Sequence, residues 1–382
     1  SDVRTTGGNG SIVIRTTAGT ITLANGSAPG AAAAPADDSA VSANGSGNVL
    51  IQALGAGTDV LLNADIVSTS GNVSVLAKRS VSFGANADIR TTSTGAGNGS
   101  IDIWAEAGAI TQSASSVLFG SGAAAVARLV AGTDVTIGDI ELADGKVGIT
   151  AGSGSILDAD PLSGGENDLD QDVTAASLRL NAGTAIGASV NHLDTTVGTL
   201  SARAANGGIW ILEANALIVG DVALAANRVR SNASVDSTDS SDATQSDVRT
   251  TGGNGSIVLR TTAGSITLTN GSAPGSGSTP VDDAAISANG SGNVLVQALG
   301  ANTDLLVNAD ILSSTGHLSL VATRNVSFGA GADLGTAGTG GLYIAATTGN
   351  LLMSADTVFT SVNGDIVMRA GNDRADQMTI GV

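Results

Sequence analysis

The sequence predicts an all-β fold, a parallel β-solenoid of about fourteen coils with loop excursions. The first observation is an alternating apolar phrase ending in alanine, which recurs at Val294, Leu318, Leu342 and Ile366. Such alternation sends every second side chain to one face of a strand. The second is the fixed period of 24 residues, which is typical of stacked coils. The third is a composition of 42% hydrophobic and 2% aromatic residues, which favours a narrow aliphatic core.

The same phrase runs through the whole chain and defines the expected coils in order. It begins at Ile12, Val49, Val73, Ile101, Ala127, Val147, Leu178, Leu200, Val222 and Ile257, before the regular series that starts at Val294. Further short strands are expected after it, for example at 60–62 and 81–83, because Gly, Asn and Asp between them favour sharp corners. No segment has a sustained helical period, so a helical solenoid is rejected.

A much longer repeat is superimposed on the coils. Residues 1–30 and 246–275 differ at three positions, where Ile14, Thr20 and Ala24 become Leu259, Ser265 and Thr269. We therefore expect a first unit at 1–245 and a second, truncated copy at 246–382, forming one continuous rod. Such near-identity predicts a parent protein with more copies. Segments 25–47, 158–172, 227–245 and 270–292 depart from the coil pattern. Segment 227–245 is either a flexible linker or a surface loop, and the prompt return of coil phrases favours the loop.

The charge balance restricts the classes of partner. The formal net charge is −18, and neither a basic stripe nor an aromatic stacking surface is evident, so nucleic acid and anionic membranes are poor partners. No apolar run is long enough to span a bilayer, so membrane insertion is not expected. The chain has no cysteine, which excludes disulfides and cysteine-ligated metals.

One acidic segment is a candidate metal site. Asp168, Asp170 and Asp172 place carboxylates on alternate residues, an arrangement that could gather oxygen ligands around Ca²⁺. The segment lacks the glycine and downstream glutamate of an EF-hand loop. The alternative is a solvated acidic loop without a bound ion. No cofactor is required by the sequence.

No set of residues predicts catalysis. A polysaccharide-cleaving solenoid needs clustered carboxylates, a basic partner and aromatic platforms, whereas Trp104, Trp210 and Tyr343 fall on different coils. We expect both tryptophans to point outward, packed laterally under a loop or free for a ligand. His192 and His317 are expected to be surface corner residues rather than metal ligands.

Several phrases resemble those of filamentous-haemagglutinin-type giant bacterial surface proteins. They are GSILDAD, LRLNAGTAIG, GNVLIQALG and, most specifically, the stretch from Asn191 to Val222. This resemblance of repeat style implies a right-handed parallel β-helix, here three-sided, within a very long secreted protein that serves as an adhesin, filament or cell-envelope component. It carries no catalytic motif to this sequence.

The expected function follows from the solenoid and the resemblance together. We expect a structural segment of a giant secreted bacterial surface protein, acting as a stiff rod in an extracellular filament, sheath or adhesin stalk. The rods would self-associate end to end or laterally, because terminal coils are open sheet edges. The alternative is an adhesin module that binds a glycan or cell-surface ligand through the loops at 25–47 and 270–292. A polysaccharide lyase or hydrolase is the remote alternative.

Overall fold

The computed structural model describes residues 2–25, 39–85, 87–95, 97–160, 170–272, 283–371 and 378–380. Within these ranges every regular element is a β-strand, which confirms the all-β prediction. None of the described residues forms a helix long and apolar enough to cross a membrane. The chain divides into unit 1 (Ser1–Ser163, Gln171–Ala176 and Ala223–Ala243) and unit 2 (Gly164–Asp170, Ser177–Val222 and Thr244–Val382), and each is described by itself.

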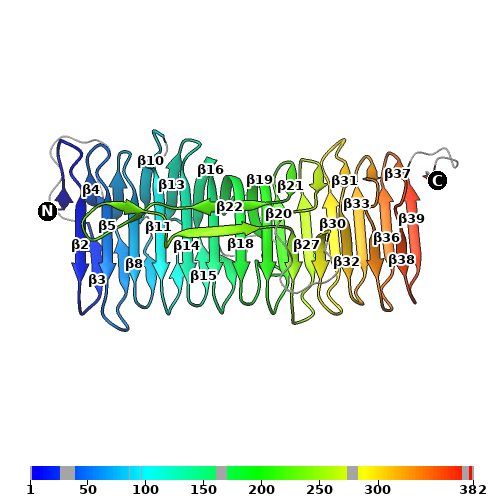
Figure 1. The fold of residues 1–382 in the computed structure, drawn as a ribbon, viewed down its shortest axis with the longest axis horizontal. Coiled ribbons are helices and arrows are strands. Elements are labelled where there is room, and N and C mark those ends of the chain that lie inside the picture. Colours follow the sequence, from blue (N-terminus) through cyan, green and yellow to red (C-terminus); the bar gives the residue numbers. More distant parts are fainter. Residues whose placement is uncertain are drawn as a thin grey trace. The chain divides into compact units, whose positions relative to one another are not determined.

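Unit 1 is built from three columns of parallel strands, and each strand pairs with its equivalent one coil away (Figure 1). The first column contains β2 (Ile12–Thr16), β5 (Val49–Ala53), β8 (Val73–Ala77), β11 (Ser100–Ala105), β14 (Val126–Ala131) and the end of β16 (Asp139–Ala151). The second contains β3 (Ile21–Ala24), β6 (Val60–Asn63), β9 (Val81–Phe83), β12 (Ile110–Thr111), β15 (Val135–Ile137) and β17 (Ile156–Asp158). The third contains β1 (Val3–Arg4), β4 (Ser39–Ala43), β7 (Asp65–Ser68), β10 (Ile89–Thr92), β13 (Val117–Ser121) and the start of β16.

Unit 2 repeats this three-column plan. Its first column contains β20 (Ile209–Glu213), β27 (Ile257–Thr261), β30 (Val294–Ala298), β33 (Leu318–Ala322), β36 (Leu342–Ala346) and β39 (Ile366–Ala370). The second contains β21 (Leu217–Val219), β28 (Ile266–Leu268), β31 (Leu305–Val307), β34 (Val326–Phe328), β37 (Leu351–Met353) and β40 (Met378–Ile380). The third contains β26 (Val248–Thr250), β29 (Ala284–Ala288), β32 (Asp310–Ser313), β35 (Leu334–Thr336) and β38 (Phe359–Ser361).

The predicted 24-residue register is confirmed in unit 2. Val294 pairs with Leu318, Leu318 with Leu342, and Leu342 with Ile366. Parallel pairing at this spacing links each coil to the next through backbone hydrogen bonds. The fold is therefore a parallel β-solenoid, as the sequence predicts.

The core of each unit is the aliphatic face of these columns. Val49, Ile51 and Ala53 of β5 are buried, as are Val296 and Leu320 of unit 2. Burying a Val, Leu or Ile side chain contributes about 1.5–3 kcal/mol, which offsets the conformational entropy lost when a coil is ordered. Because the same small residues occupy successive rungs, neighbouring coils fill one continuous dry interior.

Two of the predicted coil phrases lie elsewhere than expected. The phrase at Val222 is not a lead strand: its residues form β22 (Val222–Ala225), which pairs with β25 (Ser241–Gln245) in a separate two-stranded sheet. The alternation of apolar residues alone does not distinguish a strand of the solenoid columns from a strand that packs on their outer surface. The phrase at Leu200 lies in β19 (Leu193–Ala204), and its Ala202–Ala204 part pairs with β26 in the third column rather than with the lead strands. β18 (Val173–Ala182) is divided between the units.

The two long copies also share their corner chemistry. Arg79 pairs with Asp59 in unit 1, and at the equivalent place Arg324 donates to Asp304 at 2.9 Å in unit 2. In each pair the hydrogen bond from the arginine is the main reason that the pKa of the aspartate is lowered. Both aspartates also accept a backbone N–H from the residue after the arginine, so each ion pair fixes a corner between consecutive coils.

Candidate functional site

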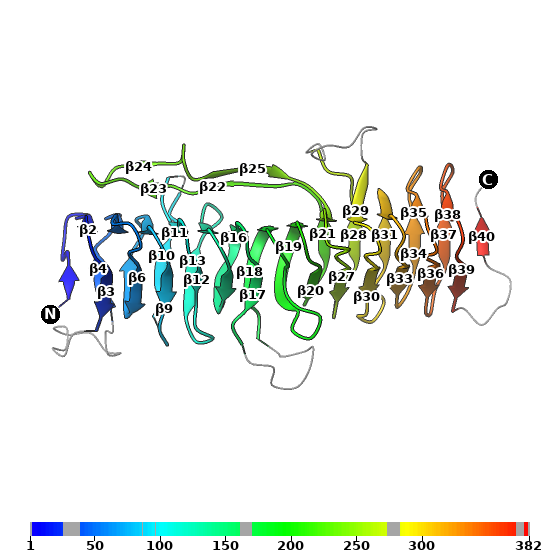
Figure 2. The same cartoon turned by 90° about the horizontal axis from the view of Figure 1, so that it is seen from below.

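The strap, defined as Ala223–Ala243, is the main departure from the coils of unit 1. It contains most of β22 and part of β25, and its middle forms an antiparallel hairpin of β23 (Arg228–Val229) and β24 (Val235–Asp236). Figure 2 shows these strands running along the coils of unit 1 instead of joining them. The predicted 227–245 excursion is therefore an ordered element.

The strap covers the outward side of the first column. Val229 packs with Leu50 and Leu76, and Trp104 packs partly buried against this cluster. The backbone N–H of Val229 donates to the Ser74 hydroxyl at 2.8 Å. Successive lead strands present these residues outward, because their neighbours on either side point into the core.

A buried ion-pair network fixes the strap at the next two coils. Asp102 is fully buried and accepts Arg228 Nε from the strap at 2.6 Å and Arg128 Nη1 from the adjacent coil at 3.3 Å. Arg128 also donates from Nε and Nη2 to the two carboxylate oxygens of Asp242, both at 3.1 Å. Two strap residues and two coil residues thus neutralise one another in a place where an unpaired charge would be costly.

Gly148 permits the close approach of the strap beyond this network. A Cβ atom at this position would lie 2.3 Å from Leu224 Cδ2 and 3.2 Å from an Asp242 carboxylate oxygen. Gly148 pairs with Arg128 in the outward row of the first column. The absence of a side chain here leaves space for Leu224, which packs with Val126 and Ala226.

A pocket of about 490 Å³ remains between the strap and the coils of unit 1. Its lining includes four arginines, Trp104, Gln52 and Asp239; the arginines are Arg15, Arg128, Arg228 and Arg230. The Arg228 guanidinium carbon lies 4.9 Å from the centroid of the Trp104 ring, and Arg15 Nε donates to Gln52 Oε1 at 2.7 Å. This arrangement of guanidinium, amide and aromatic groups can bind a polar ligand that carries a carboxylate or hydroxyls.

The end of the strap hairpin, residues 230–239, which we call the strap tip, carries both an arginine and the acids that neutralise it. Arg230 Nη2 donates to Asp236 at 2.6 Å and to Asp239 at 3.1 Å. Hydrogen bonds from the Thr238 side chain and backbone, followed by that from Arg230, lower the pKa of Asp236 to about 2. The tip therefore keeps Asp236 ionised over the physiological range.

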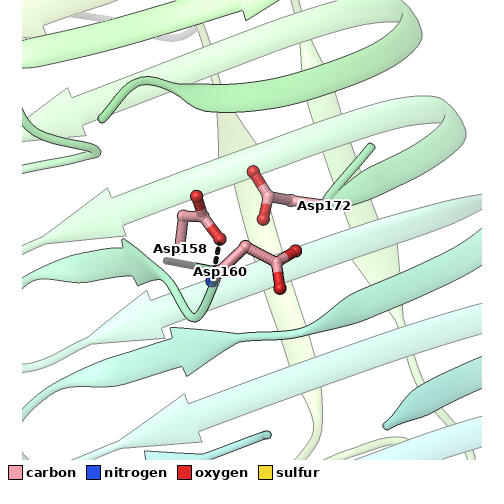
Figure 3. Close-up of side chains that lie close together, drawn as sticks. All are labelled: Asp158, Asp160 and Asp172. Atoms are coloured by element: carbon pink, nitrogen blue, oxygen red, sulfur yellow. Dashed lines mark hydrogen bonds between the residues drawn. The ribbon is translucent and has the colours of Figure 1, made fainter. Parts of the chain in front are cut away.

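The predicted calcium ligands are only partly described. Asp168 lies outside the described residues, and Asp170 is exposed and belongs to unit 2. Asp172 is buried in unit 1, where it lies with Asp158 and Asp160 so that one carboxylate oxygen of each falls within 4.8 Å of the others (Figure 3). The backbone N–H of Asp160 donates to Asp158 Oδ1 at 2.6 Å. Three carboxylates at this separation have the chemistry of a Ca²⁺ site, and calcium binding stays a prediction.

The other predicted residues fall in different places. Trp104 and Trp210 are half-buried between inward neighbours, and Trp104 lies under the strap as expected. His317 is an exposed corner residue whose Nδ1 accepts the Gly341 N–H at 2.9 Å. The prediction for His192 is wrong, since His192 is only 3% exposed. It directly precedes β19, whose first residues are buried against β20, and this burial had no signal in the local polar sequence.

Glu213 is a buried acid that the sequence reasoning missed. It occupies the rung of β20 that pairs with Thr261, and Ala298 follows on the next coil. Its carboxylate accepts the Thr195 hydroxyl at 2.7 Å and the Asn215 N–H at 3.1 Å, yet burial dominates and raises its pKa to about 7. The phrase Ile209/Ile211 was overlooked as a lead strand because it ends in this glutamate instead of alanine.

The strap contacts did leave one readable signal in the sequence. Asp102 and Arg128 both interrupt lead phrases at the same outward rung, and the register pairs them directly. Opposite charges on adjacent rungs indicate a cross-strand ion pair. The burial of Asp102 and Arg128 could not be predicted from the sequence, because the strap that covers them follows about a hundred residues later.

The comparisons with known proteins leave the family open. No family model, curated protein or solved structure matches this chain. The resemblance to filamentous-haemagglutinin-type proteins therefore stays a prediction.

Proposed function

We propose that this chain is a structural repeat segment of a giant secreted bacterial surface protein. In this role it is a stiff β-solenoid rod within an extracellular filament, sheath or adhesin stalk, and no enzymatic activity is assigned to it. The observation that supports the proposal is the in-register stacking within each unit, where equivalent aliphatic residues occupy successive rungs. A continuous ladder with a dry interior resists bending, because bending would break hydrogen bonds and open the core.

The positions of several acids support a non-enzymatic role. The acids of the corners, such as Asp59 and Asp304, are engaged in ion pairs that hold consecutive coils. Asp102 is fully buried beneath the strap, where a substrate has no access to it. These three acids thus have structural partners that explain their positions.

The rod proposal is tested by adding one repeat to the intact chain. Inserting a further copy of residues 1–245 before Ser246 should lengthen the particle by about 40–50 Å, since each coil adds ~4.8 Å. Small-angle X-ray scattering would give the maximum dimension and the cross-sectional radius. The proposal requires a longer particle with an unchanged cross-section. A particle that grows in all directions would contradict it.

A second candidate, a ligand-binding adhesin module, is favoured by the arginine- and tryptophan-lined pocket. About half of the residues in the loops first expected to bind a ligand lie outside the described residues, whereas this pocket lies between the strap and the coils of unit 1. An acidic glycan fits its guanidinium groups. Arg15→Ala should weaken binding on an array of carboxylated glycans, and Arg260→Ala, at the equivalent position of the second copy, is the matched control. Equal binding by wild type and Arg15→Ala would argue against this function.

A further inference from the structure

The outward side of the first column exists twice in this chain, and three of the residues that contact the strap are repeated. Asn48, Leu50 and Ser74 of unit 1 correspond to Asn293, Leu295 and Ser319 of unit 2. Two of the unit 1 residues bond directly to the strap: Asn48 Nδ2 donates to the Ala233 carbonyl at 3.0 Å, and Ser74 accepts the Val229 N–H. Unit 2 thus repeats these three groups, whereas Tyr343 and Val367 occupy the rungs that Asp102 and Arg128 occupy in unit 1.

These groups are covered in unit 1 and open in unit 2. Leu50 is 1% exposed and Ser74 is fully buried, whereas Leu295 and Ser319 are half-buried and Asn293 is exposed. We call Asn293, Leu295, Ser319, Tyr343 and Asp365 the second face. A further segment that packs on a half-buried leucine removes apolar surface from water, which favours binding there.

The second face also complements the charge of the strap. In unit 1, Arg228 stacks on Trp104 and pairs with the Asp102 carboxylate. In unit 2, a pocket of about 490 Å³ has Ser319, Tyr343 and Asp365 among its lining residues. Arg369 already lies over Tyr343, with 5.7 Å between its guanidinium carbon and the ring centroid, so this ring accepts a guanidinium group. An aromatic ring and a carboxylate are the two groups that Arg228 uses in unit 1.

We propose that the second face binds the strap of a second copy of this chain. Val229 of the incoming strap lies on Leu295, its N–H donates to Ser319, and Arg228 meets Tyr343 and Asp365. The strap gives up its ion pairs with Asp102 and Arg128 when it leaves its own coils, so exchange between chains has to be driven by concentration. The contact joins unlike surfaces, so it gives a ring where the rotation between copies closes and an open series where it does not. The inference goes beyond the spacer role and does not depend on it.

Engineered cysteines test the contact without competing disulfides, because the chain has no native cysteine. Chains with Val229→Cys are mixed with chains carrying Ser319→Cys and oxidised gently at increasing concentration. The expected result is a disulfide-linked dimer whose yield rises with concentration. The double variant Ser74→Cys, Val229→Cys should instead crosslink within one chain, which shows that the altered strap still docks.

A peptide of residues 222–245 gives an independent measurement. Fluorescence anisotropy of the labelled peptide should show one saturable site on the wild-type chain. Leu295→Glu should weaken binding by about tenfold or more, since it places an unpaired charge under Val229. Leu306→Glu, at an exposed leucine of unit 2 outside the second face, is the matched control and should leave binding unchanged. Absence of both the crosslinked dimer and the peptide binding would overturn the proposal, as would peptide binding that Leu295→Glu does not affect.

Discussion

Leu50 and Leu295 occupy the same rung of the same repeated strand, yet only Leu50 is fully buried. The coils beneath them are built alike, with an aliphatic interior in both units. The difference comes from the strap, whose Val229 meets Ser74 across 155 residues of sequence in unit 1. A solenoid face is therefore not inherently an inside or an outside surface, because a distant segment decides how much of it is exposed.

A charge placed in the interior should have the largest effect, and it should be equal in the two copies. Val296→Asp and its equivalent Ile51→Asp each bury an unpaired carboxylate, which costs on the order of 4 kcal/mol or more. Limited proteolysis and thermal melting should show loss of the altered coil and its neighbours. Leu320→Asp and Val75→Asp form a second matched pair. Melting curves identical to wild type would contradict the shared dry core.

Removing Asp102 should affect unit 1 alone. Asp102→Ala leaves Arg128 and Arg228 without their shared carboxylate, and breaking such a buried pair costs about 3–5 kcal/mol. The strap should detach, so that trypsin cleaves after Arg228 and Arg230 much faster than in wild type. Tyr343→Ala, on an outward rung of unit 2, should leave this cleavage unchanged. Equal cleavage rates in wild type and Asp102→Ala would show that the ion pairs do not hold the strap.

Glu213 should make unit 2 sensitive to pH. Its pKa is raised by burial to about 7 in the folded state, above its usual value of 4.5. The folded state therefore holds the proton more tightly, so stability should be highest below about pH 4.5 and fall until about pH 7, by roughly 3 kcal/mol. Thermal melting at pH 5 and pH 8 measures the difference. Glu213→Gln should remove most of it, and a pH dependence unchanged in that variant would assign the effect to other groups.

Truncating Leu50 and Leu295 tests whether the strap adds burial at Leu50. Leu50→Ala should cost about 2 kcal/mol, because it leaves a cavity beneath the strap. Leu295→Ala should cost under about 1 kcal/mol, because water already reaches that side chain. Chemical denaturation monitored by a reporter in each unit would measure both values. Equal losses would mean that the strap adds no burial at Leu50.

Calcium should have the smallest effect, confined to the Asp158, Asp160 and Asp172 cluster of unit 1. If the ion binds with a millimolar dissociation constant, a tenfold excess of Ca²⁺ over that constant should add about 1.4 kcal/mol of stability and raise the melting temperature. Asp160→Asn should remove the shift, whereas Asp365→Asn in unit 2 should retain it. No shift in wild type would mean that these three acids do not bind the ion.

The sequence predicted the features that recur in every coil and missed the contacts that occur at only one place in the chain. The 24-residue register from Val294 to Ile366 could be read because every coil meets the same neighbours. Residues 227–245 of the strap were expected to leave the coils, but its beginning could not be recognised, since Leu224 and Ala226 alternate as a coil strand does. Glu213 broke the alanine-ending phrase and concealed a lead strand. In each case the deciding contact, whether Gly148 with Leu224 or Glu213 with Thr195, joins positions that no periodic rule relates.

The buried carboxylate of Asp102 imposes an order of events on a chain made from its amino end. Its coil emerges well before Arg228, so in the nascent protein this acid faces water and incurs no desolvation cost. The arginine arrives only after more than a hundred further residues, and closure expels the water in a late step. Until then the outward side of the first coils is uncovered, and any delay in synthesis would prolong the time during which another molecule could bind there.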